Sequence, residues 1–157
     1  MTRILWLTFG VLLVIGVLTA TRLSAQAEQS TNHQKLIFEG DVALWTVAIK
    51  PDKTADFEKI MTKMREALAK STDPQRRQQA DGWKIMKVAK PLPDGNIAYV
   101  HIVNPVVKGA DYTIMQTLYD AYPDERNALY ELYRGAFAQS LALATGSVAV
   151  DLSSPHP

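Results

Sequence analysis

The spacing of apolar positions changes several times along the chain, and each change predicts a structural element. Residues 42–50 (VALWTVAIK) are almost all apolar, which predicts a strand buried on both faces. Residues 54–71 place apolar side chains on one helical face, so they predict a helix, with Thr54 as its N-cap. The polar residues 72–81 predict a connection with a single helical turn after Pro74.

Two further strands are predicted around a tight turn. Residues 83–90 alternate between two faces and carry lysines on both, which is typical of an edge strand because charge there prevents unwanted pairing. Residues 96–104 also alternate and predict the partner strand. Residues 91–95 (PLPDG) between them contain an Asp-Gly pair, which indicates a hairpin turn.

The C-terminal third predicts helices followed by a short strand. Residues 111–144 keep a helical apolar face, with Asp111 as N-cap, and Pro123 marks the start of a second helix within them. Gly146 is expected to cap the helical region. Residues 147–152 (SVAVDL) then predict the final strand.

The predicted order of elements is βαββαβ. Two right-handed crossovers in this order give an α+β, ferredoxin-like fold, a four-stranded antiparallel sheet with its helices on one face. The strand at residues 42–50 is also apolar on its other face, so that face needs a second cover. A partner sheet related by twofold symmetry is the simplest cover, and we therefore expect a homodimer.

The N-terminus is typical of a secretory signal peptide. Arg3 precedes an uncharged, apolar run over residues 4–20, and the small-residue site Ala25-Gln26-Ala27 follows. We expect cleavage after Ala27 or Ala25 and a secreted or periplasmic protein. An uncleaved membrane anchor is the alternative, because the run of 17 residues is close to the minimum of about 17 for a spanning helix.

Composition leaves room for one domain after that segment. The chain has 157 residues, of which 47% are hydrophobic. We divide it into a signal peptide (1–27), a flexible polar leader (28–35), an α+β domain (36–152) and a tail (153–157). The absence of cysteine excludes disulfides and thiolate metal sites, and a net charge of +1 gives no field that would attract nucleic acid.

The chain resembles the dimeric α+β barrel superfamily. The resemblance rests on the order and lengths of the elements over residues 40–152 and on the strand-to-helix join at residues 104–112 (NPVVKGADY). It also resembles an exported bacterial branch with this join and a tyrosine-rich second helix. The superfamily includes antibiotic-biosynthesis-type monooxygenases, haem-degrading enzymes, muconolactone isomerases and small stress-responsive proteins. The resemblance therefore implies a fold and dimerisation, and no catalytic motif accompanies it.

His101 is the histidine that lies within the predicted core, on a strand face shared with Tyr99. These two are the candidate catalytic residues, with His101 as a general base or an axial haem ligand. The alternative is a structural histidine bonded to a neighbouring group. Asp151 would pair with His101 only if strand pairing brings them together. One core histidine without cysteine argues against a protein-only metal site, and we predict no cofactor.

Aromatic residues supply the candidate ligand site. Five of the six tyrosines lie within 22 residues, and they would project within an arc of about 80° if one helix continued through Pro123. Tyr112, Tyr119 and Tyr122, together with Trp83, are therefore candidates for binding a small planar ligand. The alternative is a stripe at the edge of the core, with the rings on the sheet and the hydroxyls in water.

The polar connection holds an isolated basic pair, Arg76 and Arg77. We expect these side chains to be solvated rather than to form a phosphate site.

Two classes of function follow from these patterns. The first is an exported homodimeric module that binds a small molecule or serves as an accessory protein. The second is a cofactor-independent monooxygenase or a haem-handling enzyme that uses a pocket around His101. A membrane-tethered interaction domain is a third reading, and it requires an uncleaved N-terminal helix. The sequence does not decide whether the protein is an enzyme.

Overall fold

A computed structural model describes residues 34–153 of the chain. The predicted signal peptide and residues 28–33 of the predicted leader lie outside the described residues, as do residues 154–157 of the tail. Within the part that the structure describes, no helix is both long and apolar enough to cross a membrane.

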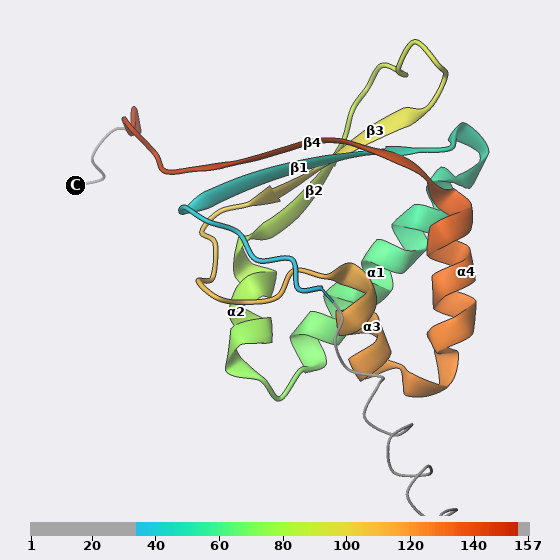
Figure 1. Ribbon diagram of the computed structural model, residues 1–157, viewed down its shortest axis with the longest axis horizontal. Helices are drawn as coiled ribbons and strands as arrows, with labels where there is room; N and C mark the ends of the chain where they lie inside the picture. Colours follow the sequence, from blue (N-terminus) through green and yellow to red (C-terminus); the bar gives the residue numbers. More distant parts are fainter. Residues whose placement is uncertain (1–33, 154–157) are drawn as a thin grey trace, which may run out of the picture. The chain divides into compact units, whose positions relative to one another are not determined.

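Four strands form one antiparallel sheet. They are β1 (Val42–Ile49), β2 (Trp83–Lys87), β3 (Ile97–Val103) and β4 (Phe137–Gly146). Their order across the sheet is β2-β3-β1-β4, so β2 is an edge strand, as predicted (Figure 1). The prediction of an α+β fold with a four-stranded antiparallel sheet is confirmed, and the strand order is compatible with a ferredoxin-like arrangement.

The helices lie on one side of this sheet (Figure 1). The α-helices are α1 (Thr54–Lys70), α2 (Pro74–Gly82), α3 (Ile114–Ala121) and α4 (Arg126–Ala136). Two 3₁₀ turns, η1 (Pro51–Lys53) and η2 (Pro123–Glu125), precede α1 and α4. The break at Pro123 occurs where the sequence predicts it.

Helix α1 packs its predicted apolar face into the core. Phe57 and Ile60 have no exposed surface, and Met64 and Leu68 are buried beside them. The prediction for Thr54 is wrong, because η1 leads directly into the helix and the N-cap position falls on Lys53, which makes no side-chain capping bond.

The residues that precede β2 fold into a nine-residue helix, α2, rather than the predicted connection with one turn. Pro74 occupies the first turn, and the carboxylate of Asp73 accepts a hydrogen bond from the Gln75 amide at 2.8 Å. The helix ends at Gly82, where close packing requires glycine. A Cβ at this position would lie 2.6 Å from the carbonyl oxygen of Pro105.

The predictions for the segment around Asp111 and for the C-terminal strand are wrong. Helix α3 begins at Ile114, and Asp111 lies before it, where its carboxylate accepts a hydrogen bond from the Thr113 amide at 2.9 Å. Helix α4 ends at Ala136, and residues 137–146 form β4 instead of continuing the helix to Ala144 with Gly146 as its cap. Pairing with the free edge of β1 overrides the helical preference of this Leu- and Ala-rich segment. Residues 147–152, the predicted final strand, lie beyond the sheet and are exposed.

The two faces of the sheet have different surroundings. Trp45 lies opposite His101 and Val47 opposite Tyr99, and these side chains pack against the helices. The other face carries no helix among the described residues (Figure 1), and Leu44 and Met86 on it are 43% and 49% exposed. This open face is formed by Val42, Leu44 and Thr46 of β1, Lys84 and Met86 of β2, and Val100 and Ile102 of β3, whereas Ala48 and Ala98 at one end of the same face are buried.

Candidate functional site

His101 and Tyr99 share the helix-covered face of β3, as predicted. The imidazole of His101 has no exposed surface. Its ring is stacked on Trp45, with the centroids 4.6 Å apart, and the ring of Phe57 lies edge-on to it at 6.2 Å. Helix α1 and the two neighbouring strands therefore enclose this side chain.

One hydrogen bond and burial define the protonation state of His101. The indole Nε1 of Trp83 donates to its Nδ1 at 3.1 Å, so Nδ1 is an acceptor and the ring proton belongs on Nε2. Burial lowers the pKa of His101 to about 4, because a charged imidazolium would lose its hydration there. Nε2 is buried and has no hydrogen-bond partner. The side chain is thus a neutral imidazole with one unused donor.

Tyr99 is bonded to a different group. Its hydroxyl donates to the carboxylate of Glu58 at 2.6 Å, and the ammonium of Lys87 donates to the same carboxylate at 2.9 Å. Burial raises the pKa of Tyr99, and the hydrogen bond from Tyr99 lowers the pKa of Glu58. Tyr99 and His101 both contact the ring of Phe57, at 4.7 and 6.2 Å, but their polar atoms have separate partners.

The His–Asp pair considered for the last strand does not form. Asp151 lies beyond β4, and its carboxylate accepts a hydrogen bond from the Ser153 amide at 2.8 Å. Because residues 147–152 do not join the sheet, strand pairing cannot bring Asp151 to His101.

The four aromatic candidates lie in different surroundings. Trp83 and Tyr112 pack together with ring centroids 5.3 Å apart, and Tyr112 is fully buried. Tyr119 lies beside the guanidinium of Arg126, 5.7 Å from its ring, and Tyr122 lines a surface pocket. The single tyrosine face required one continuous helix, and the break at Pro123 removes that condition.

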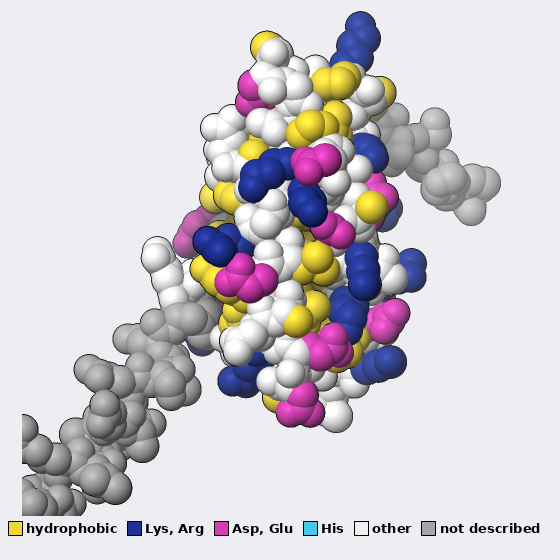
Figure 2. Space-filling view, turned by 90° about the vertical axis from the view of Figure 1, so that its right-hand side faces the viewer, with side chains coloured by type: hydrophobic (Ala, Val, Ile, Leu, Met, Phe, Trp, Pro, Cys, Tyr) yellow, Lys and Arg dark blue, Asp and Glu magenta, His cyan; other side chains and the backbone are white. Residues whose placement is uncertain are grey.

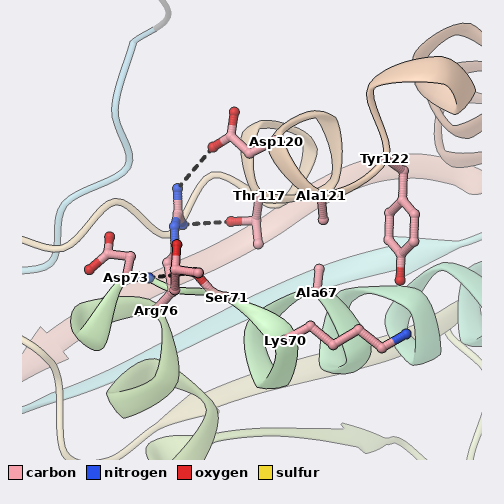
Figure 3. A pocket seen from close by; sticks show the side chains of 10 residues that line it. Ala67, Lys70, Ser71, Asp73, Arg76, Thr117, Asp120, Ala121 and Tyr122 are labelled. Carbon is pink, nitrogen blue, oxygen red and sulfur yellow. Dashed lines mark hydrogen bonds and ion pairs between the residues drawn. The ribbon is translucent and has the colours of Figure 1, made fainter.

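A pocket of about 450 Å³ opens between the C-terminal end of α1, the start of α2 and helix α3 (Figure 3). Its wall has a polar part and an apolar part. The lining residues are Ala67, Lys70, Ser71, Thr72, Asp73, Arg76, Thr117, Asp120, Ala121 and Tyr122.

Arg76 is the organising residue of this pocket. Its side chain is 15% exposed, and Nη1 donates to the Asp111 carbonyl at 2.7 Å and to the Thr117 hydroxyl at 2.5 Å. Nη2 lies 3.8 Å from the Asp120 carboxylate. The expectation that Arg76 and Arg77 are both solvated is wrong for Arg76. Arg77 is exposed, whereas packing of α2 beside α3 buries its neighbour.

The hydroxyl groups at the polar end of the pocket hold its walls together. Thr117 receives the hydrogen bond from Arg76, and Ser71 Oγ accepts one from the Asp73 amide at 3.2 Å. No pattern in the sequence predicts this pocket, because its residues come from three separate helices. The sequence predicts one of these helices, α2, as a polar connection. Among the residues that the structure describes, no group of three His, Asp or Glu side chains is placed to hold a metal ion.

Comparisons of the chain with protein-family models, with curated proteins and with solved structures gave no match.

Proposed function

We propose that the protein is an exported homodimer that binds a small molecule and acts as a binding or accessory module. The pocket around Arg76 carries this proposal. It is concave, its guanidinium is held in place by two short hydrogen bonds, and its volume of about 450 Å³ lies within the range typical of small-molecule sites. Its hydroxyls support the walls, which suits recognition rather than nucleophilic chemistry.

The open face of the sheet supports the homodimer. Leu44 and Met86 are about half exposed on a face that a second copy of the same sheet would cover. Beyond β4, Val148, Val150 and Leu152 alternate along the chain and are 59%, 71% and 90% exposed. Exposed apolar surface of this kind is typical of an interface, and a twofold partner brings the same surface to both copies. The paired sheets would form the barrel that the resemblance implies.

The distribution of charge supports a small-molecule ligand over nucleic acid. On the face shown in Figure 2, basic and acidic side chains are interspersed. The chain as a whole carries a formal net charge of +1. A nucleic-acid surface requires basic side chains gathered on one face.

An enzyme that uses His101 is the second candidate. The unpartnered Nε2 of this residue favours it, because a buried donor without a partner is uncommon and a ligand atom would satisfy it. This reading requires Trp45, Trp83 or Phe57 to move, since their rings surround the imidazole. Monooxygenase and haem-handling activities, which occur in the superfamily that the chain resembles, belong to this second candidate.

Native mass spectrometry of the protein, exported from its own N-terminal segment and purified without refolding, tests the proposal. We expect chains that begin at Glu28 or Gln26, a dimeric mass, and an additional non-covalent mass. The His101→Phe variant is expected to retain that additional mass, because the pocket is lined by other residues.

Four results would contradict parts of this account. An empty dimer would remove the binding role, and a monomer would remove the barrel. A chain that begins at Met1 would indicate a retained anchor. Loss of the bound mass in His101→Phe, with the fold intact, would favour the enzyme.

A further inference from the structure

We infer that the pocket around Arg76 binds a small zwitterion with an apolar body, such as a free α-amino acid or a dipeptide. This inference rests on the proposed binding role and names the chemistry of the ligand. It follows from the placement of two positive groups, two negative groups and an apolar surface around one small pocket (Figure 3).

Arg76 provides the position for a carboxylate. Its Nη1 is used by the Asp111 carbonyl and the Thr117 hydroxyl, which fixes the plane of the guanidinium. Its Nη2 lies 3.8 Å from the carboxylate of Asp120, too far for a hydrogen bond. A guanidinium held in this way, with an edge left over, is suited to a planar carboxylate. Lys70 adds a second positive charge at the rim, where its side chain is 75% exposed.

Asp120 and Asp73 make a simple anion a poor ligand. Both carboxylates line the same pocket as Arg76, so the charges of the lining side chains cancel. A ligand with only a carboxylate would meet repulsion from these two groups as well as attraction to Arg76. Asp120 Oδ1 accepts a hydrogen bond from Gln116 at 2.6 Å, which steadies this carboxylate at the pocket wall. A ligand that also carries an ammonium group would satisfy both signs.

The remaining wall is apolar and sets the size of the ligand. Ala67 of α1 and Ala121 of α3 lie between the polar end and the ring of Tyr122 (Figure 3). The ammonium of Lys63 lies 4.4 Å from the centre of that ring, which holds the ring in place. An aliphatic or aromatic side chain of the ligand would lie on this surface. A pocket of about 450 Å³ is suited to a molecule of one or two residues.

Isothermal titration calorimetry of the exported protein separates the contributions of the ligand's carboxylate and ammonium groups to binding. The probes are L-phenylalanine, L-leucine and the dipeptide Leu-Phe, with 3-phenylpropionate as the carboxylate alone and phenethylamine as the ammonium alone. We expect the zwitterions to bind about tenfold or more tightly than either half-ligand, since each half-ligand leaves one pocket charge without a partner.

Two variants and one control locate the binding. Asp120→Asn and Arg76→Gln are each expected to weaken zwitterion binding about tenfold or more. Asp120 is 54% exposed, so its substitution does not threaten the fold even if that of the more buried Arg76 does. Arg65→Gln is the matched control, because Arg65 is exposed on α1 and does not line the pocket.

Equal affinity for zwitterion and half-ligand, unchanged binding by Asp120→Asn, or no binding of any of the three zwitterions at millimolar concentration would overturn the inference. A co-purifying ligand that is not a zwitterion would also overturn it, while leaving the binding role in place. An exported protein that carries no ligand of any kind would instead contradict the proposed function.

Discussion

Acid should destabilise this protein through His101. The imidazole is neutral in the folded protein because burial holds its pKa at about 4, against 6.5 for an ordinary histidine. Between these two pH values the unfolded chain binds a proton at this position and the folded protein does not. The free energy of unfolding should therefore fall as the pH drops from about 6.5 to about 4, and this residue contributes no further loss below about 4.

The size of the effect follows from the two pKa values. Each pKa unit corresponds to about 1.4 kcal/mol, so the difference between 6.5 and about 4 corresponds to a loss of about 3 kcal/mol. The free energy of unfolding of a folded protein is typically about 5–15 kcal/mol, so a loss of this size is a large part of the total. Gln79 and Thr117 are the other buried polar residues among those described, and neither side chain takes up a proton between pH 6.5 and 4.

Denaturant unfolding of wild type and His101→Phe, measured at several pH values between 7.5 and 4, provides the assay. The variant loses the bond to Trp83, which should cost about 1–3 kcal/mol at every pH because the partly buried indole donor is left without a partner. Between pH 7.5 and 4, the free energy of unfolding of the variant should fall by about 3 kcal/mol less than that of wild type. The other two histidines, His33 and His156, are common to both proteins. Parallel pH profiles for the two proteins would refute the reasoning.

Three further substitutions test the packing and the proposed interface. In thermal unfolding, Gly82→Ala should destabilise the fold by about 1–3 kcal/mol, because its Cβ would meet the Pro105 carbonyl oxygen at 2.6 Å. The control is Gly135→Ala, where the new Cβ would have open space. It should stabilise α4 by about 0.5–1 kcal/mol in the same experiment. Tyr99→Phe should cost about 1 kcal/mol in denaturant unfolding through loss of the hydrogen bond to Glu58, and an unchanged midpoint would show that bond to be unimportant. Met86→Asp on the open face should convert the proposed dimer to a monomer in sedimentation velocity. The control Ala69→Asp, at an exposed position of α1, should leave the dimer unchanged. A dimer in both variants would place the interface elsewhere.

The elements with a strong period were predictable from the sequence. The apolar spacing of α1 and the alternation of β3 each match one structure only, and both form as expected. Residues 137–144 are different, because their leucines and alanines favour a helix, although the segment forms a strand. The free edge of β1 decides between them, and that edge is a long-range feature that no local pattern contains.

The candidate sites show the same division. The shared face of Tyr99 and His101 follows from alternation along one strand, and it was predicted correctly. The burial of Arg76 depends on the packing of α2 beside α3, so its bonds to the Asp111 carbonyl and to Thr117 join residues 35 and 41 positions apart. The sequence shows only an isolated basic pair, Arg76 and Arg77, and this pattern gives no indication of such contacts.

The mass of the exported protein under native conditions tests the central proposal most directly, when wild type is compared with Asp120→Asn. We predict a wild-type dimer that carries one small zwitterion in each pocket, and an Asp120→Asn dimer that has lost most of it. A wild-type protein that is an empty monomer would contradict both the interface and the binding role.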